Sequence, residues 1–240
     1  MYNAEAVVVG SKNFGEADRI VQLFTREQGL VEAIAYGARR PKSGFSASLQ
    51  MFSHVEVALS EGKRIDTVKS AVLKEHFKRV NEDIEVMAYG AFVAEFLREF
   101  LPRGENSAAA FDIVLSVLDS FERRNPRVTA LIAVLQLLEF TGIELHYERC
   151  VHCGKKIEGD AFFSVDEGGA LCQEHQEENA IPFPNELREF ILTLRDFNWN
   201  AETLTVKGKL LVEAEKIILD YLENTLGHDL KSLKFIRTLN

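Results

Sequence analysis

The sequence predicts an α+β protein with more than one domain, in which a small β-barrel precedes a helical body. Three observations support this prediction. As far as about residue 75, short segments rich in β-branched and aromatic residues alternate with turns, whereas apolar residues recur at helical spacing after Val80. A short segment that holds all three cysteines interrupts the helical pattern. With 240 residues, the chain is also long enough for two or three compact units.

The N-terminal segment is expected to contain five strands. They are predicted at residues 3–9, 19–25, 30–36, 53–59 and 65–73. Glycine-containing turns of hairpin type separate the second strand from the third and the fourth from the fifth. Five antiparallel strands in a segment of this length favour a Greek-key barrel of the OB type, a fold that binds oligonucleotides, and we assign it to residues 1–80.

The helical body is expected to occupy residues 81–147 and 179–240. Five helices are predicted, at about residues 84–100, 111–118, 126–141, 185–197 and 206–226. The apolar stripe of the first helix includes Ile84 and Met87 and is expected to face the core. Asn125 is the expected N-cap of the third helix, and Gly142 and Gly227 are expected helix ends. Helices of this length can form a bundle.

The three cysteines and one histidine follow the pattern CxxC-x18-CxxH. Three thiolates and an imidazole at this spacing form a complete tetrahedral ligand set for one Zn²⁺ per chain. The predicted ligands are Cys150, Cys153, Cys172 and His175. Because a site with four protein ligands has no open position, we expect a structural zinc ribbon at residues 148–178, inserted between the helices.

Other interpretations of the cysteines carry less weight. Clustering argues against scattered core thiols, and the odd number without a signal peptide argues against a secreted disulfide scaffold. The fourth ligand is the weakest assignment, because His146 and His152 lie nearby and compete with His175. A zinc-dependent hydrolase or deaminase would need an open metal position and a general base. Since the sequence also lacks the common catalytic motifs, we expect no enzyme.

The charge is distributed unevenly along the chain. The whole chain has a net charge of −9. Residues 1–80 hold twelve Lys and Arg against nine Asp and Glu, which gives +3, and the remainder therefore has −12. A polyanion would accordingly meet the N-terminal segment, while the acidic body would contact proteins or act as a scaffold. No segment has the length of a membrane span, so the expected location is the cytoplasm.

A basic loop follows the third predicted strand. Residues 37–44 contain Arg39, Arg40 and Lys42 together with Pro41 and two glycines. Such a loop can place guanidinium groups on phosphates while its glycines let the backbone approach closely. Several nearby aromatic residues are candidates to stack on bases, although we expect about half of them to be buried. They are Phe14, Tyr36, Phe45 and Phe52.

Residues 15–31 and 37–43 resemble the N-terminal signature of the RecO family of bacterial recombination mediators, and the likeness continues to the cysteine segment. It implies an OB barrel, a helical body and a zinc insert. It also implies a non-enzymatic DNA repair factor of the RecF recombination pathway, associated with the nucleoid. Such proteins bind single- and double-stranded DNA, anneal complementary strands, engage RecR and the single-stranded DNA-binding protein, and help load RecA. The expected DNA-binding residues are Lys12, Arg19, Arg39, Arg40, Lys42, Lys63 and Arg64.

The sequence departs from the family pattern at four positions. His175 replaces a common fourth cysteine, which keeps a good zinc ligand. Tyr36 and Gly44 stand where the family often has cations, so the loop is expected to hold fewer phosphates. Met51 replaces a usual proline, with no functional consequence expected. An alternative function, favoured by the acidic body, is a protein–protein scaffold that reaches DNA only through its partners.

Overall fold

The structure is a computed structural model that describes residues 1–105, 108–200 and 203–239. It divides into two compact units: unit 1 comprises residues 1–130 and 231–240, and unit 2 comprises residues 131–230. Unit 1 joins the barrel to helices that the predicted domains separate from it, and the domain boundaries stay predictions. None of the helices in the described ranges has the length and apolar character of a transmembrane segment.

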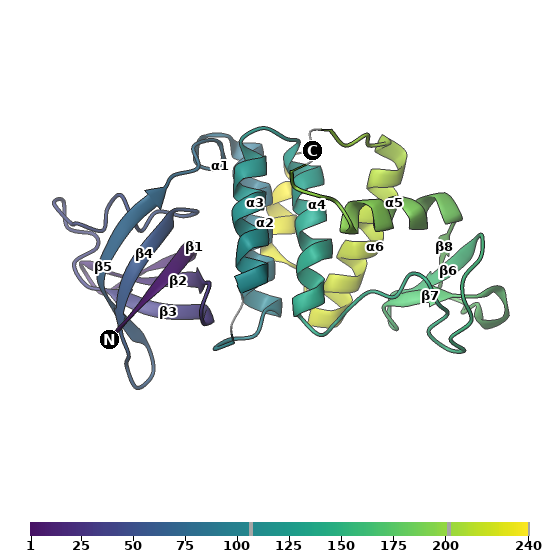
Figure 1. Cartoon of the computed structure of the whole chain (residues 1–240), viewed down its shortest axis with the longest axis horizontal. Helices are drawn as coiled ribbons and strands as arrows, with labels where there is room; N and C mark the ends of the chain where they lie inside the picture. The colour runs from purple at the N-terminus through teal and green to yellow at the C-terminus, as the bar shows by residue number, and fades with distance from the viewer. Residues whose placement is uncertain (106–107, 201–202, 240) are drawn as a thin grey trace. The chain divides into compact units, whose positions relative to one another are not determined.

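Unit 1 begins with a closed five-stranded barrel (Figure 1), which confirms the predicted fold. Around the barrel the strands follow the order β1-β2-β3-β5-β4, and β4 pairs with β1 to close it. The strands are β1 (Tyr2–Phe14), β2 (Asp18–Thr25), β3 (Gly29–Ala35), β4 (His54–Ser60) and β5 (Asp66–Glu75). Closure of the sheet into a barrel leaves few strand edges unpaired.

The prediction of five antiparallel strands is wrong at one pairing. β3 and β5 run parallel where Ala33 pairs with Asp66 and Ile34 with Thr67. The other four pairings are antiparallel. The parallel pair arises because a loop of residues 36–53 and the whole of β4 separate the two strands, so β5 returns beside β3 in the same direction. A hairpin-by-hairpin interpretation of the sequence does not include this crossover.

β1 is longer than predicted because it continues past a β-bulge. The register shifts between Val8 and Gly10, and pairing with β2 then runs from Gly10 opposite Gln22 to Phe14 opposite Asp18. The sequence pattern predicts that this strand ends at Val9, which is wrong by five residues. The bulge reverses which side chains face the barrel interior, since Val8 lies opposite Leu23 of the core before the bulge, whereas after it the odd-numbered Ser11 lies opposite Val21 of the core. The carbonyl of Val9 accepts a hydrogen bond from the guanidinium group of Arg98.

Small and β-branched side chains fill the barrel interior. Every strand contributes, and Ala38 and Leu49 of the loop 36–53 are buried in the same core, with Phe45 packed against it. Small side chains suit a five-stranded barrel, whose interior is narrow. The core residues of the strands are Ala4, Ala6, Val8, Val21, Leu23, Ala33, Ala35, Val55, Val57, Leu59 and Val68.

Helices follow the barrel in unit 1. They are α1 (Arg79–Glu82), α2 (Ile84–Phe100), α3 (Ala108–Phe121) and the first residues of α4 (Pro126–Leu137). Asn125 caps α4 as predicted, because its Oδ1 accepts the Val128 N–H at 3.2 Å. The prediction that Ile84 and Met87 face the core is wrong, since both are exposed. They lie in the first turn of α2, and the buried stripe of that helix begins at Val86.

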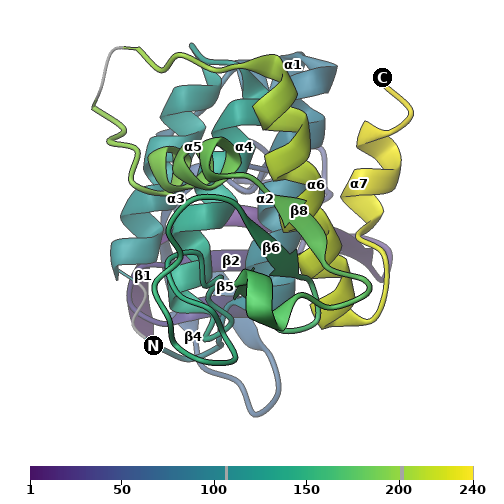
Figure 2. The same cartoon turned by 90° about the vertical axis from the view of Figure 1, so that its right-hand side faces the viewer.

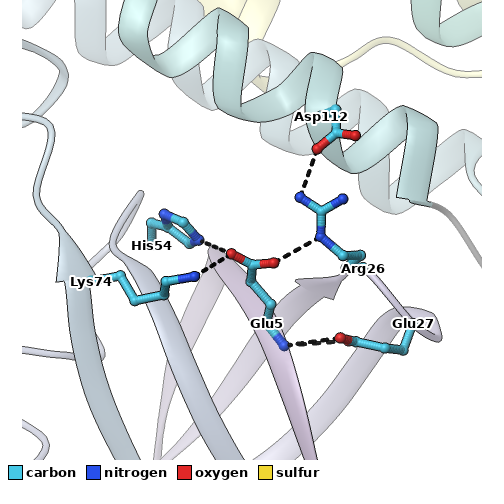
Figure 3. Close-up of polar contacts among 6 residues, drawn as sticks. All are labelled: Glu5, Arg26, Glu27, His54, Lys74 and Asp112. Carbon is cyan, nitrogen blue, oxygen red and sulfur yellow. Dashed lines mark hydrogen bonds and ion pairs between the residues drawn. The ribbon is translucent and has the colours of Figure 1, made fainter.

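Glu5 of β1 organises the contact between the barrel and α3 (Figure 3). Its carboxylate contacts three nitrogen atoms: His54 Nε2 at 2.9 Å, Lys74 Nζ at 2.5 Å and Arg26 Nε at 2.7 Å. Arg26 also forms an ion pair with Asp112 of α3, in which Nη2 of Arg26 is 2.6 Å from Oδ1 of Asp112. The Lys74 ammonium is the largest influence on Glu5, and with Arg26 and His54 it lowers the pKa of the carboxyl to about 2 against the cost of burial. Glu5 of β1 thus connects β4 and β5 to the helical layer.

We expect Glu5→Gln to destabilise the protein by about 1–2 kcal/mol at neutral pH, because water still reaches part of the carboxylate. The pKa in the folded protein lies below the ordinary value of 4.5. The stabilisation is therefore complete above about pH 5 and is lost as the pH falls from 4.5 towards 2. Urea unfolding at several pH values measures this difference. Glu56→Gln, an exposed carboxylate opposite Glu5 in the ladder, is the control. A wild-type advantage that stays constant down to pH 2 would contradict this account.

The last helix of the sequence, α7 (Lys231–Ile236), also belongs to unit 1 and packs against α2. Glu95 of α2 is only 7% exposed, and its carboxylate accepts the N–H groups of Lys231 at 3.0 Å and Ser232 at 2.8 Å. The Ser232 hydroxyl donates a third hydrogen bond at 2.5 Å. Glu95 therefore caps a helix that is 136 residues away in the sequence. The sequence pattern does not predict α7.

Unit 2 combines helices with a small sheet. The helices are the end of α4, α5 (Asn185–Arg195) and α6 (Gly208–Leu226), and Gly227 ends α6 with a φ of 71° as predicted. The sheet has the order β7-β6-β8 and consists of β6 (Ala161–Ser164), β7 (Gly169–Leu171) and β8 (Ile181–Phe183). β6 and β8 lie side by side in Figure 2. β8 was not predicted, since three residues with a central proline have no strand signal.

Candidate functional site

The seven predicted DNA-binding cations all belong to the barrel. Six are exposed and Arg19, at the start of β2, is half-buried. None of the seven forms an ion pair with any residue that the structure describes. Arg26, Lys74 and Lys78 of the same segment all do. The seven positive charges are thus not neutralised by neighbouring carboxylates and remain available to a polyanion. They are Lys12, Arg19, Arg39, Arg40, Lys42, Lys63 and Arg64.

Hydrogen bonds join the basic loop to the turn between β1 and β2. The Arg39 N–H donates to the carbonyl of Ala17 at 2.9 Å. The Arg39 guanidinium contacts the carbonyls of Gly15 and Glu16 at 3.3 and 3.2 Å. This arrangement brings Arg39 to the end of the barrel where β1 ends and β2 begins. Lys12 and Arg19 flank this turn, and Arg40 and Lys42 follow in the loop.

Lys63 and Arg64 lie in a second place, the hairpin between β4 and β5 that projects from the barrel in Figure 1. Asp66, at its end, accepts the Gly62 N–H at 3.0 Å and pairs in the ladder with Ala33 of β3. No hydrogen bond among the described residues joins this hairpin to the loop 36–53. The connections β1–β2 and β4–β5 are the two that bind oligonucleotides in OB folds. The predicted cations thus form two groups on one barrel.

The four candidate aromatic residues divide evenly, as expected. Phe14 and Tyr36 are 47% and 59% exposed, whereas Phe52 is buried and Phe45 packs against the barrel core. Phe52 has a positive φ of 63° and lies against the helical layer, where the ideal Cβ of a residue replacing Gly90 would be 3.0 Å from its ring. Only Phe14 and Tyr36 therefore remain as surfaces for a base.

The predicted metal ligands converge in unit 2. The Sγ atoms of Cys150, Cys153 and Cys172 and a ring nitrogen of His175 all lie within 4.8 Å of one another. Cys153 and Cys172 have their sulfurs 3.9 Å apart, and Cys172 Sγ is 3.2 Å from His175 Nδ1. A tetrahedral site with bonds of about 2.3 Å to sulfur separates its sulfurs by about 3.8 Å. The four side chains are therefore placed to hold one metal ion.

Local backbone turns present these ligands. After Cys150, the N–H of Gly154 returns to the Cys150 carbonyl at 2.8 Å, and Gly154 takes a φ of 71° that favours glycine. Burial disfavours ionisation of the Cys150 thiol, but backbone N–H groups of Cys172, Cys153 and His152 outweigh it and lower its pKa to about 6. A thiolate is the form that binds metal.

The competing histidines are not part of this cluster. His152 directs Nε2 to Glu177 at 3.0 Å, and its ring stacks on that of His175 with centroids 5.5 Å apart. Glu177 also accepts the Ser164 hydroxyl at 2.9 Å. His146 is exposed and pairs through its backbone with Gly169. The choice of His175 as the fourth ligand agrees with this geometry.

Unit 2 also contains a cavity that the sequence does not predict. The cavity, of about 610 Å³, lies beside the cysteine segment, and its lining includes the buried side chains of Leu135, Leu145 and Tyr147. Charged side chains of both signs surround it, so it has no single electrostatic preference. They are Glu139, Glu144, Glu148, Arg149, Glu167 and Arg195. In the described part of the chain, the cluster of three cysteines and one histidine is the only group placed to hold a metal.

Comparison with protein families supports the resemblance found in the sequence. A family model described as "Recombination protein O N terminal" matches residues 1–77. A second, described as "Recombination protein O C terminal", matches residues 81–234. The break between them falls at the start of α1, where the barrel ends.

Curated relatives agree with these models over the full length. A protein of Symbiobacterium thermophilum named "DNA repair protein RecO" is 32% identical over 247 residues, which cover 100% of this chain and 98% of the relative. Proteins of the same name from Pelotomaculum thermopropionicum and Bacillus cereus are 29% and 27% identical, and the matches cover 98% of this chain and 93% and 96% of the relatives. With both halves matched by family models and the fold as expected, the chain belongs to the RecO family of DNA repair proteins.

Proposed function

We propose that this chain acts in DNA repair as a non-enzymatic adaptor whose barrel binds single- and double-stranded DNA. The observation that carries the proposal is the set of seven barrel cations without ion-pair partners among the described residues. Phosphate contacts supply most of the affinity of sequence-independent DNA binding. A closed OB barrel with unpaired cations at the β1–β2 turn, the loop 36–53 and the β4–β5 hairpin suits that role.

Annealing and recombination follow from such binding. A protein that neutralises the phosphates of two complementary strands lowers their repulsion and favours pairing. The family resemblance supports RecR and the single-stranded DNA-binding protein as partners and RecA loading as the outcome. The surplus of carboxylates after residue 80, a net charge of −12, keeps DNA on the barrel and leaves the rest of the surface for proteins.

We propose that the metal is Zn²⁺ and that its role is structural. Three thiolates with one imidazole are a soft ligand set that favours zinc over magnesium or calcium, which prefer oxygen. Four protein ligands fill a tetrahedral sphere and leave no position for substrate or water. The residues that would hold the ion are Cys150, Cys153, Cys172 and His175.

Replacing Arg39, Arg40 and Lys42 together with alanine tests the barrel as the DNA site. We expect weaker binding of a fluorescent single-stranded oligonucleotide. We also expect the slope of log K against log salt to fall by about 2, since each lost phosphate contact removes about 0.7. Titration at several salt concentrations measures both quantities.

The control variant replaces three exposed lysines of unit 2, Lys156, Lys209 and Lys216, and so changes net charge by the same amount. It should keep the wild-type slope. If the triple variant keeps that slope as well, DNA binds elsewhere on the protein. Wild-type protein that fails to bind DNA at low salt would instead support a scaffold that reaches DNA through its partners.

A further inference from the structure

We propose that Phe14 and Tyr36 form a two-ring platform that stacks on unpaired bases, so that this face of the barrel prefers single-stranded to double-stranded nucleic acid. The inference rests on the proposed function, because it names the form of DNA that the barrel binds best. It arises from the strand register and from the bulge in β1.

The register places the two rings in one row across three strands. Phe14 at the end of β1 lies opposite Asp18 at the start of β2. Arg19 lies opposite Ala35 at the end of β3, and the turn that follows stays close to Asp18, whose carboxylate accepts the Gly37 N–H, so Tyr36 lies beside Asp18. Neighbouring strands are about 4.8 Å apart, which separates Phe14 from Tyr36 by about 10 Å. One flexible strand of nucleic acid can therefore contact both rings.

Both side chains leave the barrel on its outer surface. Ala35 is buried in the barrel core, so alternation directs the following residue, Tyr36, outward. On β1 the even-numbered side chains up to Val8 point into the core. The bulge between Val8 and Gly10 reverses this order and turns Phe14 outward. Without the bulge, Phe14 would have the orientation of Val8.

Exposure of these two rings is unusual for this barrel. Phe24 and Phe52 are fully covered and Phe45 is partly covered, whereas Phe14 and Tyr36 are 47% and 59% exposed. No aromatic side chain in the described residues stacks on either ring. A single exposed aromatic residue needs no explanation, but two in one row form a surface. Stacking on aromatic side chains is how OB folds hold single strands without reading their sequence.

Charges beside the row fit a nucleic-acid strand whose bases face the rings. Lys12 lies two residues before Phe14 on the same side of β1, and Arg39 extends over the turn that joins Phe14 to Asp18. These cations can hold phosphates at the edge of the row. Between the rings, the Asp18 carboxylate accepts the Gly37 N–H at 2.7 Å. Its negative charge repels phosphate there, which favours bases over the middle of the row.

Stacking of this kind discriminates against a duplex. Bases of a duplex are paired and already stacked on their neighbours, so their faces cannot meet a protein ring without melting the helix. The side chains of Arg39, Arg40 and Lys42 can contact the phosphates of single-stranded and double-stranded DNA alike. The ring platform therefore adds affinity for single strands alone.

A double variant, Phe14→Ala with Tyr36→Ala, tests the platform in the full-length protein. The ligands are a fluorescent oligothymidine and an abasic oligomer of equal length, which carries the same phosphates without bases. We expect oligothymidine affinity to fall about 30-fold, the loss for two stacked bases at the low end of measured values. Affinity for the abasic oligomer and the salt slope should not change.

Two further variants complete the test. Phe14→Leu with Tyr36→Leu keeps apolar bulk without aromatic faces and should lose the same affinity for oligothymidine. Phe235→Ala removes a ring of similar exposure, 43%, from α7 of the same unit and should bind like wild type.

Four outcomes would overturn the inference. If the wild-type protein binds both oligomers with equal affinity, the bases contribute nothing to binding. Unchanged oligothymidine affinity in the alanine variant would show that the rings do not contact bases, while leaving the cation site intact. An equal loss for the abasic oligomer in both double variants would assign the residues to barrel stability. Wild-type protein that binds neither oligomer would overturn the proposed function as well.

Discussion

Removal of the metal is expected to unfold the cysteine segment of residues 148–178 while the barrel stays folded. The sheet in this region has strands of only four, three and three residues, too few to form an independent core. Structural zinc contributes about 10–16 kcal/mol of binding free energy in small domains, which far exceeds what such a sheet can supply. Without the ion, the buried Cys150 and Cys172 lose the partner that holds the segment together.

Hydrogen exchange with peptide resolution measures this effect after treatment with a chelator or in a Cys150→Ser variant. Peptides that cover residues 148–178 should lose protection, and peptides that cover residues 1–80 should keep it. The salt dependence of DNA binding should also persist, because all seven candidate cations lie in the barrel. His152→Ala is the matched control, since His152 stacks on a ligand but is not one. Unchanged protection in the Cys150→Ser protein would refute a structural metal.

Glu95→Ala is expected to release α7 and to destabilise unit 1 by about 3–5 kcal/mol. The substitution leaves three donors without their acceptor, namely the N–H groups of Lys231 and Ser232 and the Ser232 hydroxyl. Burial alone would raise the pKa of Glu95, but the hydrogen bonds from Ser232 and Lys231 outweigh it and lower the pKa. The stabilisation is therefore present above the ordinary pKa of 4.5 and is lost as the pH falls below it.

Urea unfolding and limited proteolysis between residues 230 and 239 report on this substitution. The alanine variant should unfold at lower urea and be cleaved near α7 in conditions where the wild type is resistant. Glu99→Ala, one turn further along the same helix at an exposed position, provides the comparison. If the two variants unfold alike, the carboxylate of Glu95 does not hold α7.

The parts of the fold that depend on neighbours in sequence could be predicted, and the parts that depend on distant contacts could not. Strands β2 to β5 lie within two residues of their predicted positions. The continuation of β1 to Phe14 was missed because Gly10-Ser11-Lys12 has the composition of a loop, and only pairing with β2 keeps it extended. Helix α7 was missed because a six-residue helix needs its cap from Glu95.

The cluster of four residues placed to hold a metal could be predicted because ligand spacing encodes it. The proposed nucleic-acid face was different, since the sequence identified the cations but not which two of the four aromatic residues would be exposed. That choice depends on the bulge at Val8 and Gly10 and on the burial of Phe52 against the helical layer. Neither contact has a local signature, although alternation along β3 already indicates that Tyr36 points away from the core.

The return of the chain to unit 1 has a consequence during synthesis. Unit 1 is built from two segments that are separated by the 100 residues of unit 2. A ribosome that adds about 5–20 residues per second needs about 5–20 seconds to make those residues. Throughout that interval, the barrel and α2 have emerged but Leu233 and Ile236, both buried in the finished protein, do not yet exist. During this time the carboxylate of Glu95 and the apolar surface of α2 are uncovered in the nascent first unit. The fold of unit 1 is complete only after α7, the last helix to be synthesised, packs against α2.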